Sequence, residues 1–281
     1  LGLGESTHGS ANVFEWKFDV VCELASRGLL RAFAFEESFM VGLQVDRALR
    51  GDGDLDAAWR DAMGAWRTRA IVDGLRRLQR INSRLPVGSR VRFMGIDSKS
   101  PHLAAAALLD AGYVNVVLKA LADRRELDLS EIAEAQRVCA SAACDADQRT
   151  AGAARQVLRR IDAYDLEPGF GRLHRRDTHM AETLLENLPE RGITVVWAHN
   201  EHIPRNPDFF GGPSMGHVLA DRIGTRYTSI GVLCGDGSCR AIDPSTGDPD
   251  YRSVELPRSY PDTTDVALES LQIDFAPADK F

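Results

Sequence analysis

The segment GITVVWAHNEH (residues 192–202) decides the fold class of this 281-residue chain. It starts at a glycine, continues through β-branched and aromatic residues, and ends in two histidines. A short apolar run without polar alternation is typical of a strand that is covered on both faces, as in parallel sheets. Four other segments have the same form: LGLGE (1–5), RAFAFEES (31–38), SRVRFMGIDS (89–98) and RYTSIGVLCGDG (226–237).

Helical patterns separate these expected strands. FEWKFDVVCELASRG (14–28) and TRAIVDGLRRLQRINSR (68–84) carry apolar residues at helical spacing. Residues 101–190 are helical in pattern almost throughout, which is too much for one crossover between strands. We therefore predict an α/β fold with a mainly parallel central sheet flanked by helices. A large helical insertion or lid is expected over about 101–190, within a single domain that spans 1–281.

Composition narrows the possible partners. The formal net charge is −7 and the arginines are spread along the chain, which argues against nucleic acid and against an anionic membrane surface. No apolar run approaches the roughly 18 residues of a membrane span. The five cysteines are an odd number and predict a reducing compartment, so we expect a cytoplasmic protein. The chain shows no signal peptide, yet it begins inside an expected strand without Met, so we expect a preceding segment.

The expected strands end in residues that can do acid–base chemistry. These residues are Glu5, His8, Glu36, Asp97 and His199. Because ligands of parallel α/β sheets bind at the carboxyl ends of the strands, we expect these side chains to share one cleft. An imidazole beside a carboxylate can activate water near neutral pH, which contributes about 10² to 10⁴ in rate. His8 is the best candidate for this base, with Glu5 or Glu36 as its orienting acid.

Each of these residues also has a purely structural interpretation. His8 could cap the following helix, and Asp97 could cap the helix that begins near Pro101. Glu36 and Glu37 could be carboxylates favoured at a helix start. Since neighbouring side chains of a strand point to opposite sides, we expect one of these two glutamates in the cleft and the other in solvent.

Other chemistries compete with water activation by histidine. His199 and His202 lie three residues apart, and together with two glutamates they could bind a divalent metal. Ser6 and Ser10 lie near His8, but no G-x-S-x-G elbow is present, so a serine nucleophile is disfavoured. A phosphate loop and a dinucleotide fingerprint are also absent from the sequence.

Several motifs together suggest a family. GESTHG, FEWK, FEES, GIDS, RRDTHMAE, WAHNEHI and MGHVL occur in this order between residues 4 and 219. The chain thereby resembles the erythromycin esterase family, and the combination of GE-x-x-HG with WAHN-x-H is highly specific. The resemblance implies a metal-independent hydrolase that opens the lactone of macrolide antibiotics or acts on a related ester. It implies no cofactor and a small-molecule substrate.

The resemblance also assigns roles to individual residues. His8 is implied to be the general base, Glu5 its partner and Glu36 a second acid of the site. His199 corresponds to an essential histidine, and Lys17 to a basic residue that holds the oxyanion or the acids. Expected substrate-binding residues are His202, Asp97, Arg176 and Asp177.

The chain departs from the family pattern at two positions. Asn12 stands where relatives commonly have glutamate, and Lys17 stands where many have arginine. Lysine lacks the bidentate fork of arginine, so the change weakens paired contacts. These departures leave a macrolide substrate, and any role in antibiotic resistance, open. The alternatives to the esterase are a metal-dependent hydrolase that uses the same cluster and a non-catalytic protein that binds a small ligand.

Overall fold

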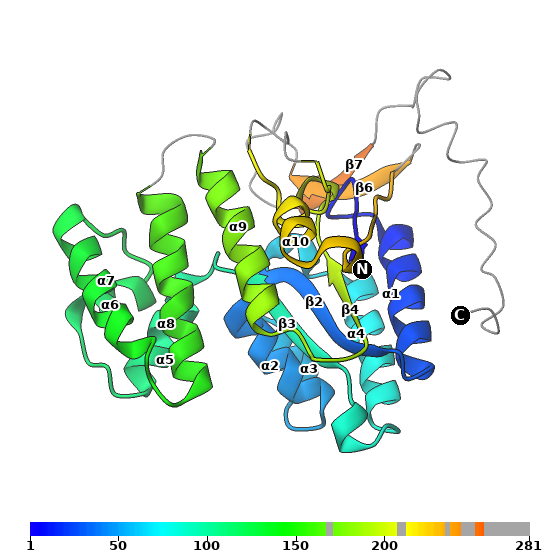
Figure 1. Cartoon of the computed structure of the whole chain (residues 1–281), viewed down its shortest axis with the longest axis horizontal. Helices are drawn as coiled ribbons and strands as arrows, with labels where there is room; N and C mark the ends of the chain where they lie inside the picture. Colours follow the sequence, from blue (N-terminus) through cyan, green and yellow to red (C-terminus); the bar gives the residue numbers. More distant parts are fainter. Residues whose placement is uncertain (167–170, 207–211, 234–236, 243–250, 256–281) are drawn as a thin grey trace.

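A parallel sheet forms the centre of the computed structural model (Figure 1), which describes residues 1–166, 171–206, 212–233, 237–242 and 251–255. Its strands are β1 (Gly2–Leu3), β2 (Leu30–Ser38), β3 (Arg92–Asp97), β4 (Ile193–Trp197) and β5 (Ser229–Ile230). Their order is β3-β2-β4-β1-β5, and every neighbouring pair is parallel. The predicted α/β class is confirmed. Because β1, β4 and β2 are neighbours, the segments that follow them meet at one edge of the sheet.

Helices cover both faces of the sheet (Figure 1). One face packs against α1 (Ala11–Ser26), α2 (Phe39–Leu49), α3 (Leu55–Trp59), η1 (Gly64–Trp66) and α4 (Arg69–Asn82). The other face packs against α9 (Gly171–Glu186) and α10 (Met215–Ile223). Alternation along β2 places Phe33 and Phe35 in the first core and Ala34 in the second. By the same period of two, Glu36 belongs to the α9 side.

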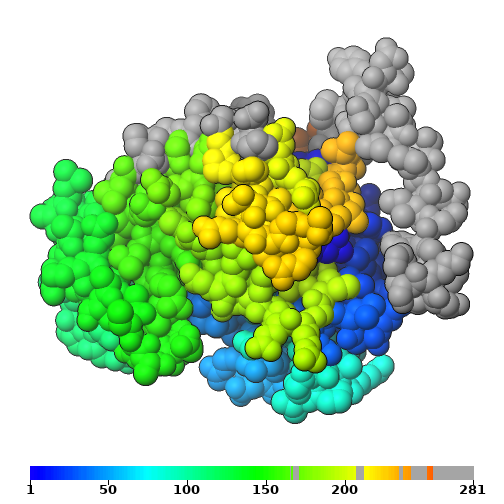
Figure 2. Space-filling view, in the orientation of Figure 1, coloured from blue at the N-terminus to red at the C-terminus, as the bar shows by residue number. Residues whose placement is uncertain are grey.

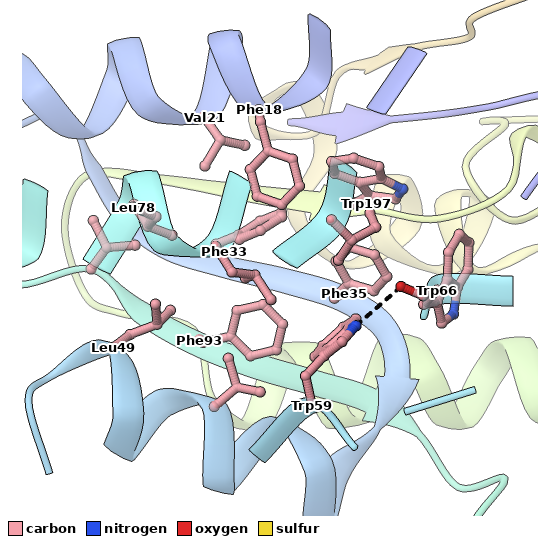
Figure 3. Packing of buried hydrophobic residues seen from close by; sticks show 14 of the residues in the cluster. Phe18, Val21, Phe33, Phe35, Leu49, Trp59, Trp66, Leu78, Phe93 and Trp197 are labelled. Carbon is pink, nitrogen blue, oxygen red and sulfur yellow. Dashed lines mark hydrogen bonds between the residues drawn. The ribbon is translucent and has the colours of Figure 1, made fainter. Parts of the chain in front are cut away.

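Aromatic side chains fill the first core (Figure 3). Phe35 stacks on Trp197 with ring centroids 5.0 Å apart. Trp59 Nε1 donates a hydrogen bond of 3.0 Å to the Trp66 carbonyl, drawn as the dashed line in Figure 3. This packing fixes Trp66, whose ring is fully buried, beside the carboxyl edge of the sheet.

Several helices follow β3 in the range where we expected a helical insertion. They are α5 (Pro101–Asp110), α6 (Val116–Ala122), α7 (Leu129–Ala142), α8 (Gln148–Arg160) and the π-helical turn η3 (Ile161–Asp165). They enclose an apolar cluster that is built largely from alanine, leucine and valine and that also includes Met40 of α2. Figure 2 shows them in green at one end of the molecule. The next helix, α9, packs on the sheet, so the helices of this cluster end with η3 and not near residue 190.

Some predicted strands differ from the structure. The first strand is two residues long, and the fifth comprises only Ser229–Ile230 of the expected 226–237. β6 (Ser238–Ile242) and β7 (Tyr251–Glu255) form a separate antiparallel pair that we did not predict. The expected last strand, LQIDFA, lies outside the described residues. Short 3₁₀ turns complete the fold: η2 (Val87–Ser89), η4 (Asn200–His202) and η5 (Gly224–Arg226). Among the described helices, none is both long and apolar enough to cross a membrane.

Candidate active site

Glu5 is the buried centre of a group of four side chains at the end of β1. Its Oε1 lies 3.0 Å from His8 Nδ1. Its Oε2 accepts hydrogen bonds from Lys17 Nζ at 3.0 Å and from Trp197 Nε1 at 2.8 Å. Glu5 and Lys17 are both fully buried. Every contact of this buried carboxylate is thus with a hydrogen-bond donor, and Lys17 supplies a counter-charge.

The turn that carries Glu5 and His8 requires glycine at residue 4. A Cβ atom on Gly4 would lie 2.0 Å from Asn200 Oδ1. Asn200 cannot withdraw, because its side chain exchanges hydrogen bonds with the backbone of Val232, beyond β5. Its backbone N–H donates to the Glu5 carbonyl at 2.8 Å. The turn after β1 is thus held against the segments that follow β4 and β5.

His8 is the exposed member of this group, with 31% of its side chain accessible. Because Glu5 accepts from Nδ1, the ring is held in the tautomer whose Nε2 carries a lone pair. Its ring packs edge-on against Trp66 at 4.5 Å and against His199 at 5.0 Å. A substrate can therefore reach a nitrogen that is prepared to accept a proton.

His199 has both ring nitrogens engaged. Nε2 donates to the Ser6 carbonyl at 3.1 Å, and Nδ1 accepts from the Glu201 N–H at 3.3 Å. Burial lowers the pKa of His199, and the neighbouring His8 lowers it further. The neutral Nε2–H tautomer follows from these contacts, so His199 offers an N–H donor beside the His8 ring.

A second polar network, centred on Arg176 of α9, lies behind His199. Arg176 Nη2 donates to Glu36 Oε1 at 2.7 Å and to Asp97 Oδ2 at 2.6 Å. All three side chains are almost completely buried. Lys99 Nζ lies 3.6 Å from Glu36 Oε1 and 3.5 Å from Asp97 Oδ2. Burial alone would raise the pKa of Glu36, but the surrounding cationic groups, led by His202 and Arg176, hold it well below its usual range.

His202 connects this network to α10. Its Nδ1 donates to Asp177 at 2.8 Å, and its Nε2 lies 3.3 Å from Glu36 Oε1. Burial alone would lower the pKa of His202, but the carboxylates of Glu36 and Asp177 outweigh it and raise the pKa to about 9. Asp177 also accepts from the Met215 N–H at 2.9 Å. His202 thus lies between two carboxylates, and Arg176 Nη1 lies 3.2 Å from its Nε2.

Glu36 joins the two networks through the backbone. Its Oε2 accepts from the His199 N–H at 3.0 Å, while its Oε1 accepts from Arg176 Nη2. Of the two orienting acids that we considered for His8, Glu5 makes the contact. Glu36 instead fixes the segment that carries His199.

The structure decides between the alternatives for Lys17 and corrects the expectation for Glu36 and Glu37. We expected Lys17 to hold the oxyanion or the acids; its Nζ is buried behind Glu5 and above the Trp197 ring, so it serves the acid and cannot reach a substrate. We expected one of Glu36 and Glu37 in solvent; both are buried, and Glu37 accepts from the Ser38 and Met63 N–H groups. Burial raises the pKa of Glu37 to about 7.

The structural interpretations also differ from the structure. Ser10 stands at the start of α1, and His8 bonds to Glu5 instead of capping this helix. Ser100 stands at the start of α5, and Asp97 pairs with Arg176. Ser6 Oγ has no hydrogen bond to either neighbouring histidine within the part of the chain that is described.

Sequence reasoning missed three residues that shape this edge. Trp66 packs on His8 and donates to the Glu36 carbonyl at 3.2 Å, Lys99 neutralises the Arg176 network, and Glu37 anchors the loop at Met63. The position of Glu37 next to Glu36 in the sequence indicated that it could lie near the site. For Trp66 and Lys99, no local pattern indicated a position near the strand ends.

Binding of a metal ion at this edge of the sheet would require several free carboxylate or imidazole ligands. Within the described ranges, no group of three or more His, Cys, Asp or Glu side chains is arranged to hold a metal ion. The oxygens of Glu5, Glu36 and Asp97 accept instead from lysine, arginine, tryptophan or backbone N–H groups. The residues present therefore do not fit the metal-ligand set that we considered as an alternative.

Comparison with known proteins agrees with the family that the sequence motifs resemble. The sequence model of the erythromycin esterase family matches residues 30–169 and 111–279, two overlapping parts of the chain. Comparison with curated protein sequences gives no match.

Three solved structures are similar in fold. A protein from Bacillus cereus has a TM-score of 0.76 at 21% identity, covering 96% of this chain and 73% of that one. A succinoglycan biosynthesis protein has the same TM-score and identity, over 92% and 71%. A mutant of the erythromycin esterase EreC, in its open conformation, has a TM-score of 0.66 at 18% identity, over 95% and 78%. At these identities the structural similarity concerns the fold alone.

Proposed function

Because the chain belongs to the erythromycin esterase family, we propose that it hydrolyses carboxylic esters or lactones with a water molecule activated by His8. The observation that carries the proposal is the His8–Glu5 pair, with an exposed imidazole outside and a buried, neutralised carboxylate behind it. This is the arrangement that general-base catalysis requires, because the acid fixes the tautomer and stabilises the imidazolium that forms.

The proposed reaction is a two-step transfer of one proton. His8 Nε2 takes a proton from water while the water oxygen bonds to the carbonyl carbon. The tetrahedral intermediate then collapses, the bond between carbon and the leaving oxygen breaks, and His8 returns the proton to the leaving alkoxide. The products are a carboxylic acid and an alcohol, joined in one molecule when the substrate is a lactone.

His199 is the proposed donor to the oxyanion. Its Nε2–H lies beside the His8 ring and would transfer its hydrogen bond from the Ser6 carbonyl to the substrate oxygen. The Arg176 network acts through His199, since Glu36 holds the backbone N–H of that residue. We assign Lys17, Glu36, Asp97, Arg176, Asp177 and His202 to positioning rather than to contact with the reacting atoms.

The substrate class is tested with a panel. Macrolides and simpler lactones and esters are incubated with the protein and with His8→Ala, and products are identified by mass spectrometry. Gain of one water with the unmodified protein alone supports the proposal, and gain on a macrolide would extend it to antibiotic inactivation. Hydrolysis of small esters alone would keep the chemistry and discard the macrolide.

Two other functions make different predictions on the same panel. A metal-dependent hydrolase would lose activity on chelation and regain it with a stoichiometric metal. A small-ligand-binding protein would retain affinity for a panel compound and give no product from any of them. A cytoplasmic location remains a separate proposal that rests on cysteine usage.

A further inference from the structure

The helical insertion contains a cavity of about 1020 Å³ that the proposed mechanism does not use. It is bordered by the segment that joins β3 to α5, the loop between α6 and α7, the end of α8 with η3, and the start of α9. Five cationic side chains line it, against two acidic ones, Glu126 and Asp128. The cationic residues are Lys99, Arg124, Arg125, Arg160 and Arg172.

The acidic residues of this cavity do not neutralise it. Asp128 caps α7 and accepts from the Glu131 N–H at 2.9 Å and from Ser130 Oγ at 2.7 Å. Arg125 pairs with Glu131, and Lys99 lies within 4 Å of Glu36 and Asp97. Arg124 contacts His102 and has no carboxylate partner among the described residues. A partly enclosed cavity with excess positive charge attracts anions.

Arg124 has an unusual backbone conformation. Its φ is +60°, the left-handed region, and no other non-glycine residue in the described ranges has a positive φ. The hydrogen bonds from Arg124 N to Leu121 O and from Arg125 N to Ala120 O form a helix C-cap in which glycine is the preferred residue. An arginine in this conformation lowers the stability of the fold by about 1 kcal/mol relative to glycine. Strain of this kind gathers at ligand sites, where it positions a side chain.

The Arg124 guanidinium faces a neutral neighbour. Its Nη2 lies 3.0 Å from His102 Nε2, which accepts the hydrogen bond. Burial lowers the pKa of His102, and the charge of Arg124 lowers it further, so the imidazole stays uncharged. The positive charge of Arg124, an exposed residue that lines the cavity, is therefore not neutralised by His102.

The cavity adjoins the candidate active site. Lys99 lines it and lies within 4 Å of both Glu36 and Asp97. Lys99 Nζ also contacts Met63 Sδ at 3.8 Å, in the loop that leads to Trp66. Lys99 thus connects the cavity to the Arg176 network, which holds the backbone of His199 through Glu36.

We propose that this cavity binds a carboxylate- or phosphate-bearing part of the substrate, with Arg124 as a principal contact. The proposal rests on the proposed function and narrows it to esters or lactones that carry a negative charge. Arginine suits both groups because its planar fork donates two parallel hydrogen bonds. A cationic substituent in the same place would be repelled.

The kinetic test compares two esters of similar size, 4-nitrophenyl hydrogen succinate and 4-nitrophenyl butyrate. Arg124→Gly removes the charge at a position where the backbone favours glycine, so the melting temperature should not fall. We expect the ratio of kcat/KM for the anionic over the neutral ester to drop about tenfold. Arg137→Gln, which removes an exposed arginine from α7, should leave the ratio unchanged. An unchanged ratio in Arg124→Gly would refute the proposal that Arg124 binds an anionic part of the substrate.

A binding measurement separates this site from the hydrolase proposal. Succinate and its uncharged analogue succinamide are titrated calorimetrically into the full chain and into Arg124→Gly. We expect succinate alone to bind, about tenfold more weakly to the variant. If this difference appears while neither ester is hydrolysed, the anion site stands and the hydrolase proposal falls. If the esters are hydrolysed but succinate binds no better than succinamide, the anion site is refuted.

Discussion

His8 Nδ1 lies 3.0 Å from Glu5 Oε1, at the point where the first strand of the sheet ends. The other oxygen of Glu5 is shared by Lys17 and Trp197, both buried. The imidazole is therefore paired with a carboxylate whose orientation is fixed by two further donors. This relationship converts a strand-end histidine into a candidate general base.

Replacement of Glu5 by Gln should lower both the rate of ester hydrolysis and the stability of the fold, and a second substitution should restore only the stability. The amide cannot stabilise an imidazolium, so ester hydrolysis should fall by about 10² to 10⁴. The variant also leaves Lys17 buried without a counter-charge, and its free energy of unfolding should fall. In the double variant with Lys17→Met, stability measured by urea denaturation should partly recover while the rate stays low. Recovery of both would show that Glu5 acts only through folding.

Arg176 should be more important for stability than its neighbour Arg175. Arg176→Met leaves Glu36 and Asp97 as buried charges and should cost about 3–5 kcal/mol of unfolding free energy. Arg175→Met removes a half-exposed ion pair with Asp162 and should cost at most about 1 kcal/mol. Denaturant titration of both variants measures the difference. Equal costs would contradict the buried network.

His202 should give stability a defined dependence on pH. Its pKa is about 9 in the folded chain and 6.5 ordinarily, so its contribution is fully present below pH 6.5 and is lost as the pH rises through 9. The full contribution is on the order of 3 kcal/mol. The stability difference between the unmodified protein and His202→Gln should therefore shrink over this range. His217→Gln, at a histidine with no carboxylate partner among the described residues, should show no such trend.

Removal of metal ions should not change activity. The carboxylates of the site accept from lysine, arginine, tryptophan and backbone groups, so no set of free ligands remains in the described part of the chain. Dialysis against a chelator, followed by an assay on the best ester of the panel, tests this. Loss of activity with recovery on adding one equivalent of zinc would favour the metal-dependent alternative.

The sequence was informative about the edge of the sheet because backbone rules place residues there. Glu5, Glu36, Asp97 and His199 follow apolar runs, and the carboxyl ends of parallel strands share one edge. That rule places them without any knowledge of their partners. Arg176 is different: it lies on a helix 79 residues beyond Asp97, and only tertiary packing selects which helical arginine faces the sheet.

Burial was the property that the sequence could not supply. Lys17 and Glu37 are charged residues that an average rule places in water, yet both are buried because a particular partner receives them. The Arg124 conformation is likewise set by the turn between α6 and α7, where the residue type favours no left-handed backbone. These features depend on the partners that each residue meets in the folded chain.

The most direct test of the account is the turnover number of His8→Ala on an ester that the unmodified protein hydrolyses. His8 is partly exposed, so the substitution should leave the melting temperature nearly unchanged. The account predicts a fall in kcat of about 10² to 10⁴ with that fold intact. Turnover of a folded His8→Ala at the unmodified rate would contradict it and assign the water activation to another group.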